Sequence, residues 1–212
     1  MRWGEGMYGI VRVLIGIVFL GCFIGMINHS KVLHKRKLYI AFSGIAVALS
    51  AALWFLPFEN SFITFDSHEA AYEYCHFGDS EPDLVIEGNT CDFVVDCKGE
   101  MKEYSMIPKT SDGWKIGIGS DSKIVAQDIF ESIVVYVYQY KENRDFFVTV
   151  LDTSGGEAAV SDGYGSQFYP LETLASSGEQ FVTYYAHLSE FGTEYYLTVN
   201  GNEIKLGNNT LQ

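Results

Sequence analysis

Histidines and acidic residues in the long C-terminal part of the chain are the first candidates for acid–base or metal chemistry. Glu73 and His76 form an E-x-x-H pair at the i, i+3 spacing of a helix, with Glu69 one turn earlier. Di-metal proteins use this spacing, but they need matching residues from other long helices, and only one short helix is predicted here. We therefore interpret the pair as solvated polar side chains. A cleft that combines His187 or His76 with a carboxylate would instead favour an enzyme.

Two acidic, glycine-containing segments, residues 152–156 and 162–166, could hold a hard cation through carboxylate and carbonyl oxygens. Their spacing does not match an EF-hand loop, and Asp-Gly is first of all a turn signal. No serine lies in a G-x-S-x-G motif, and no G-x-x-x-x-G-K-[ST] motif for a nucleotide occurs. The sequence therefore predicts no catalytic residue, no metal site and no cofactor, although distant Ser, His and Asp side chains could converge in space.

Three of the four cysteines, Cys75, Cys91 and Cys97, follow the apolar N-terminal part. Cys91 and Cys97 lie on one face of a predicted strand, about 20 Å apart, which is too far for a disulfide. Cys75 lies at the end of a predicted helix and could reach either of them. We therefore predict one disulfide, Cys75 with Cys91 or Cys97, with free thiols as the alternative. The spacing of the cysteines is not that of a metal site.

Two apolar spans, residues 8–28 and 39–57, have the length of a transmembrane helix, which needs about 20 residues to cross a bilayer core. The first contains one ionisable residue, Arg12, which we interpret as an anchor whose guanidinium reaches the headgroups. The second contains no charged residue. The first span is longer than the apolar region of a signal peptide, and lipidation of Cys22 is an alternative. The sequence predicts a two-helix transmembrane hairpin over residues 1–58.

The loop between the two spans, residues 29–38, predicts the orientation, because Lys and Arg accumulate on the cytoplasmic side. The loop carries four basic residues, Lys31, Lys35, Arg36 and Lys37. The sequence near either outer end of the hairpin carries fewer. We therefore expect a multi-pass protein of the plasma membrane, with this loop in the cytoplasm and both termini outside.

Small residues recur along both spans at a spacing that allows two helix backbones to approach closely. They are Gly21, Gly25, Gly44, Ala48 and Ala52. We expect them to pack the two spans against each other. The same residues could instead bind a second copy of the chain or the helices of a larger partner.

Charge divides the chain into two parts. Residues 1–57 carry a net charge of +5 and residues 58–212 a net charge of −18, for a total of −13. A domain this acidic repels nucleic acid phosphates and anionic headgroups, so nucleic acid is excluded as a partner. The lipid bilayer and a protein or surface partner of unknown kind are the expected partners.

Residues 59–212 predict an acidic, mainly β (α+β) extracytoplasmic domain with one short helix. The helix begins with Asp66 or Ser67 as N-cap, ends near Phe77, and is expected to lie against a sheet. The domain is predicted to consist of antiparallel sheets in a sandwich-like arrangement, either as one domain or as two subdomains divided near 123–131. The predicted strands are 83–87, 91–98, 101–107, 114–118, 132–140, 145–151, 168–171, 180–188, 195–199 and 203–206.

Tyrosines are concentrated in the strand 132–140, where alternation places them on one face and the aliphatic residues on the other. An exposed row of tyrosines could bind glycan or peptide, whereas a buried one stabilises a sheet through cross-strand pairs. We favour the structural interpretation. The two faces are Tyr136, Tyr138 and Tyr140, and Ile133, Val135 and Val137.

The sequence favours a protein that is not an enzyme. We expect a membrane-anchored protein that presents an acidic β-rich outer domain for binding, sensing or accessory interactions. Two alternatives stay open: an extracytoplasmic enzyme whose site follows no known motif, and an assembly subunit that acts through its transmembrane helices.

Overall fold

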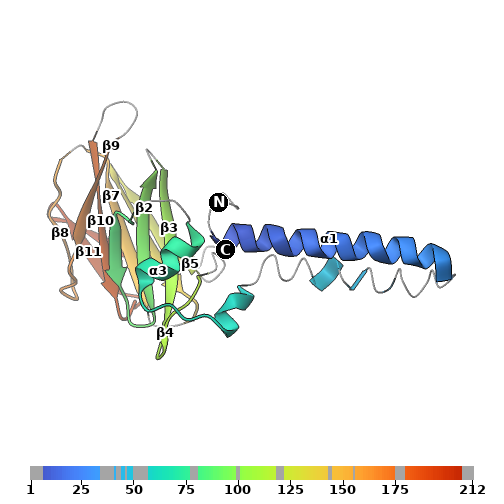
Figure 1. Ribbon diagram of the computed structural model, residues 1–212. Helices are drawn as coiled ribbons and strands as arrows, with labels where there is room; N and C mark the ends of the chain where they lie inside the picture. The colour runs from blue at the N-terminus through green and yellow to red at the C-terminus, as the bar shows by residue number, and fades with distance from the viewer. Residues whose placement is uncertain are drawn as a thin grey trace. The chain divides into compact units, whose positions relative to one another are not determined.

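A computed structural model of the chain consists of two compact units, residues 1–80 and 81–212 (Figure 1). It describes residues 7–33, 41, 44–45, 47–49, 57–76, 81–98, 101–117, 122–142, 145–154, 156–174 and 180–206. Within the first unit, helices predominate, and within the second, antiparallel strands.

A single long helix, α1 (Met7–Leu33), opens the first unit. Its segment Ile10–His29 is long and apolar enough to cross a membrane, and its apolar side chains are mostly exposed, which agrees with the first predicted span. The helix continues to Leu33, so the predicted boundary at residue 28 is too early and Lys31 lies in its last turn. Of the basic residues that predict the orientation, Lys35, Arg36 and Lys37 lie outside the described residues.

The second predicted span, 39–57, lies mostly outside the described residues. The residues of this span that the structure does describe before Pro57 are helical, at 41, 44–45 and 47–49. The described part of the chain therefore contains one candidate membrane-spanning helix, and the two-helix hairpin stays a prediction.

Arg12 is buried in the structure, which corrects its interpretation as an anchor at the headgroups. Its Nη2 lies 2.7 Å from Oε2 of Glu59, and both side chains are only 2% exposed. Glu59 belongs to the short 3-10 helix η1 (Phe58–Ser61), and the Phe58 ring centroid lies 4.5 Å from the Arg12 guanidinium carbon. A charge can be buried among apolar groups when an opposite charge accompanies it, and Glu59 supplies that charge here.

The short helix α3 (His68–Cys75) begins as the sequence predicts, because the Ser67 side chain accepts a hydrogen bond from the Ala70 amide. It ends two residues earlier than predicted, at Cys75. Its buried residues are Ala71 and Tyr72. The packing of this helix against a sheet stays a prediction.

The described residues of the second unit form three antiparallel sheets. The first has the order β1-β2-β3-β4, the second β5-β6-β7-β10-β9, and the third β12-β11-β8. The bounds of the strands are β1 Leu84–Glu87, β2 Cys91–Lys98, β3 Met101–Thr110, β4 Gly113–Trp114, β5 Ser122–Phe130, β6 Ile133–Tyr140, β7 Phe146–Asp152, β8 Val160–Asp162, β9 Tyr169–Leu174, β10 Gln180–Leu188, β11 Tyr195–Val199 and β12 Asn202–Leu206. The predicted antiparallel β architecture is confirmed.

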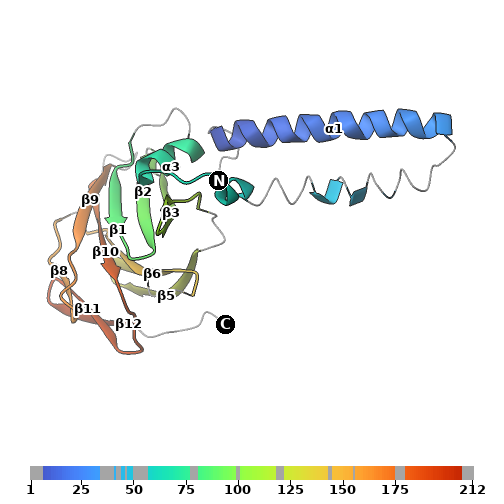
Figure 2. The same cartoon turned by 60° about the horizontal axis from the view of Figure 1, so that its bottom comes forward.

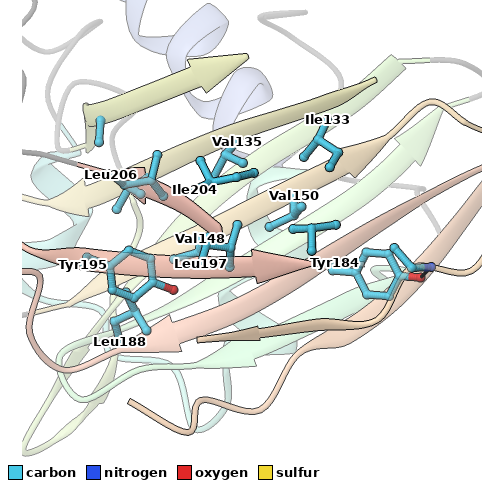
Figure 3. Packing of buried hydrophobic residues seen from close by; sticks show 14 of the residues in the cluster. Ile133, Val135, Val148, Val150, Tyr184, Leu188, Tyr195, Leu197, Ile204 and Leu206 are labelled. Carbon is cyan, nitrogen blue, oxygen red and sulfur yellow. Dashed lines mark hydrogen bonds between the residues drawn. The ribbon is translucent and has the colours of Figure 1, made fainter. Parts of the chain in front are cut away.

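The five-stranded sheet is the central layer, with the other two sheets on its opposite faces (Figure 2). Its face toward the third sheet is aliphatic except for Tyr184, and Figure 3 shows the side chains of the two sheets meeting in this core. Removing such side chains from water contributes about 1.5–3 kcal/mol for each large residue. The central sheet supplies Val135, Val137, Val148 and Val150, and the third sheet supplies Leu197, Val199, Ile204 and Leu206.

The opposite face of the central sheet is aromatic and packs on the first sheet. Tyr138 lies 5.7 Å from Phe93 and 5.6 Å from Tyr104 between ring centroids, and Tyr140 is buried. The structural interpretation of the tyrosine row is thereby confirmed for these two tyrosines. Both faces of the central sheet are buried, so the unit has three layers where a sandwich has two.

Among the described strands, β5 and β8 are not in the predicted set. The segment 123–131 was considered as a boundary between subdomains, but all of it except Glu131 belongs to β5, which pairs with β6 along its length. A β-bulge between Ile124 and Ala126 shifts the register and interrupts the alternation that identifies a strand. The other missed strand, β8, has only three residues. The division into two subdomains stays a prediction.

Candidate functional site

A pocket of about 330 Å³ lies at the C-terminal end of β10 in the second unit. One wall comes from the end of β10 and the residues that follow it, and the other from the turn after β8. These segments are far apart in sequence, and only the folded sheet brings them together. The lining residues are Tyr164, Ser166, His187, Leu188, Ser189 and Glu190.

His187 is held in this pocket by a buried carboxylate. Its Nε2 lies 2.7 Å from Oδ1 of Asp145, whose side chain is fully buried, while the His187 side chain remains 20% exposed. The ring also lies against Phe147, with 5.3 Å between the ring centroids. Because Asp145 engages Nε2, Nδ1 is the ring nitrogen that remains for other partners. An aspartate that orients a histidine in this way is a common part of acid–base sites.

Asp145 is itself surrounded by donors from the turn between β1 and β2. Oδ1 accepts a hydrogen bond of 2.9 Å from the Asn89 amide, and Oδ2 accepts one of 2.6 Å from the Thr90 amide. The Thr90 hydroxyl donates to Oδ2 as well. Gly88 allows this close approach, since a Cβ there would lie 2.3 Å from the Cys91 carbonyl oxygen and 2.9 Å from the Phe147 ring.

The hydrogen bonds from these donors favour the ionised form of Asp145. Burial alone would raise its pKa, but the hydrogen bonds from the Thr90 side chain, the Asn89 amide, His187 and the Thr90 amide outweigh burial and lower the pKa below its ordinary value. Asp145 is therefore a carboxylate at neutral pH and an acceptor, so Nε2 of His187 donates the hydrogen bond between them. A neutral His187 then presents the Nδ1 lone pair as an acceptor.

The turn after β8 places Tyr164 and Ser166 in the pocket, and Asp162 organises this turn. Its Oδ1 accepts hydrogen bonds from the Tyr164 amide at 3.1 Å and the Ser166 amide at 2.8 Å, and its Oδ2 accepts one from the Tyr195 hydroxyl at 3.0 Å. The carboxylate of segment 162–166 is thus engaged by its own turn. This arrangement agrees with the turn interpretation of Asp-Gly, and the cation interpretation gains no support from it.

Glu73 and His76, the E-x-x-H pair, lie on α3 and directly after it in the first unit. In the described chain, no group of three or more His, Cys, Asp or Glu side chains is arranged to hold a metal ion. His76 ends α3, with Nδ1 3.0 Å from the Tyr72 carbonyl oxygen and its ring stacked on the Tyr72 ring.

The cysteines of the predicted disulfide belong to both units, Cys75 to the first and Cys91 and Cys97 to the second. All are free thiols in the structure. Desolvation in its half-buried position, followed by the charge of Glu59, raises the pKa of Cys75 to about 12, so this thiol reacts slowly at neutral pH in the folded unit. The pairing of Cys75 with Cys91 or Cys97 stays a prediction.

The small residues predicted to pack helices face open space in the described chain. A Cβ built at Gly21, Gly25 or Gly44 has no neighbour within 4 Å. Ala48 is exposed, and Ala52 lies outside the described residues. Their role in helix packing stays a prediction.

Asp145 was not identified from the sequence, although His187 and the turn at 162–166 were. No local pattern marks it, because its partners lie 42 residues away at His187 and 55 and 56 residues away at Thr90 and Asn89. An acidic residue at the start of a strand looks like an ordinary turn residue. The long-range pairing of the strands creates this site.

No protein-family model matches the chain, and neither does any curated protein or solved structure.

Proposed function

We propose that this protein is a membrane-anchored binding protein whose N-terminal helices hold an acidic β-rich unit at the outer surface of the plasma membrane. The observation that carries the proposal is the contrast between the two units. The first begins with an apolar helix whose membrane-length segment is almost entirely unburied. The second, residues 81–212, holds 8 basic and 21 acidic residues and therefore the whole net charge of −13. An exposed apolar surface of this length is stable in lipid and unfavourable in water.

The ion pair between Arg12 and Glu59 supports a hairpin with both ends on one side of the membrane. From Arg12 to Leu33, α1 rises about 32 Å at 1.5 Å per residue. The chain has to return over that distance by residue 59, because Arg12 and Glu59 are in contact. An apolar helix of about 20 residues covers such a distance, and the predicted span 39–57 has the required length and composition.

Anchoring and orientation are tested together in the intact protein. We expect alkaline carbonate to leave the full chain in the membrane pellet. In a variant without the four native cysteines, Glu157→Cys should react with an impermeant maleimide on intact cells, and His34→Cys only after permeabilisation. Release by carbonate would contradict the anchor, and the reverse labelling pattern would contradict the orientation.

An extracytoplasmic enzyme is the second candidate, and the pairing of His187 with a buried carboxylate in a pocket favours it. Ser166 and Ser189 line the same pocket and could serve as nucleophiles if the Nδ1 atom of His187 acted as their base. A fluorophosphonate probe distinguishes the two candidates. If the protein is an enzyme of this kind, the probe labels the wild-type full chain. One of the two substitutions, Ser166→Ala or Ser189→Ala, then abolishes the labelling. The binding proposal predicts no labelling of the wild-type protein.

A further inference from the structure

We propose that the pocket between His187 and Glu190 binds an organic cation that carries a primary ammonium group, such as an alkylamine or a lysine side chain. This inference rests on the proposed binding function and names the class of ligand. The residues that line the pocket carry several acceptors, which suit a small group that has only donors.

The hydrogen-bonding groups of the pocket match an ammonium ion. The buried Asp145 fixes the His187 ring through Nε2, so a neutral ring directs an acceptor from Nδ1. Glu190 adds a carboxylate, and the hydroxyls of Ser166 and Ser189 can each accept a hydrogen bond. An ammonium group has three donors and no acceptor, and its hydrogen bonds to a carboxylate are stronger than those between neutral groups.

Charge selects a cation and disfavours an anion. Glu190 is the one charged residue among those that line the pocket, and Asp145 lies ionised directly behind His187. The surrounding unit carries a net charge of −13, which raises the local concentration of cations. An anionic ligand would lie beside Glu190 with no Lys or Arg in the lining to compensate it.

An organic cation fits the pocket better than a bare metal ion does. His187 and Glu190 are the only lining residues with side chains that metal ions commonly prefer, and a stable metal site normally needs three or four ligands. Tyr164, which is 49% exposed, adds an aromatic ring to the wall of the pocket. The ring can contact the carbon chain of an amine or attract its charge.

Saturation-transfer difference NMR on the full chain in lipid nanodiscs tests this proposal, with n-butylammonium as the probe. We expect saturation transfer to the probe with the wild-type protein. Glu190→Gln should weaken binding about fivefold, since it removes the charge and keeps the shape. The matched control is Glu194→Gln, which removes the same charge from an exposed residue outside the pocket; it should leave binding within about twofold of the wild type.

Each other outcome overturns the proposal in a recognisable way. If Glu190→Gln and Glu194→Gln weaken the binding of n-butylammonium equally, the acidic unit attracts cations through its net charge and the pocket is not a specific binding site. Binding of methyl glucoside, sensitive to Glu190→Gln, in place of n-butylammonium would show that the ligand class is wrong while the binding function stands. Tetramethylammonium has the same charge but no N–H donors. If it binds as tightly as n-butylammonium, the hydrogen bonds do not have the proposed role. Failure of the membrane anchor would appear only in the carbonate and labelling experiments.

Discussion

Asp145→Ala is expected to lower the free energy of unfolding of the β-rich unit by about 3–5 kcal/mol. The substitution removes one fully buried carboxylate and leaves four donors without their acceptor: the Asn89 and Thr90 amides, the Thr90 hydroxyl and His187 Nε2. Asp145 also joins the turn before β2 to the start of β7 and the end of β10. Its loss therefore removes the side-chain hydrogen bonds that join this turn to the paired ends of β7 and β10.

Urea denaturation of the full chain in mild detergent measures this effect. Trp114 lies in the β-rich unit, where its Nε1 donates a 2.7 Å hydrogen bond to Asp92 Oδ2. In a background with Trp3→Phe and Trp54→Phe, Trp114 is the only tryptophan, and its fluorescence reports this unit alone. Asp112→Ala is the control because Asp112 is exposed in a turn, and it should change the free energy by no more than about 0.5 kcal/mol. Equal effects of the two substitutions would contradict the role of Asp145.

The same carboxylate predicts a pH dependence. The pKa of Asp145 is lower in the folded protein than its ordinary value of 3.8, so the ionised form binds its partners best in the folded state. Its contribution to stability is complete above the unfolded pKa and is lost as the pH falls through the folded pKa. The difference in unfolding free energy between the wild type and Asp145→Asn should therefore be largest near neutral pH and shrink as the pH falls below about 4.

Local patterns predicted most of the strands but not their assembly into layers. Alternation in β6 separated Val135 and Val137 from Tyr138 and Tyr140 correctly, because side chains of a strand alternate between its faces. The same pattern does not say whether a tyrosine face is solvated or covered. In this fold, Phe93 from another sheet covers it.

Turns with strict backbone requirements were predictable, and contacts between distant segments were not. Asn200 and Gly201 adopt positive φ values of 52° and 82° and connect β11 to β12, and Asn-Gly is a strong local signal for such a hairpin turn. The pocket depends on pairings of β7 with β10 and on the turns that flank them. Such pairings have no signature in a window of ten residues, which is why His187 was considered without Asp145.

Arg12→Leu alone is expected to destabilise the first unit by about 3–5 kcal/mol, whereas Arg12→Leu combined with Glu59→Leu should recover most of that loss. Arg12 and Glu59 are both 2% exposed and 2.7 Å apart. Removal of one partner leaves the other charge buried among apolar side chains without its counter-charge. Removal of both leaves apolar groups of moderate size in the same place. An exposed anchor would behave differently, since its loss would not depend on Glu59.

The labelling rate of Cys75 measures the opening of this unit in the full chain. Partial burial raises the pKa of this thiol, so a maleimide reacts with it faster when the unit opens. With the other three cysteines replaced by alanine, Arg12→Leu should accelerate labelling at least about a hundredfold, and the double variant should return it to within about tenfold of the parent. Glu73→Leu replaces an exposed carboxylate of α3 and serves as the control. Equal labelling rates of Arg12→Leu and the double variant would show that the two charges are not coupled. The ion pair would then no longer support the helical hairpin.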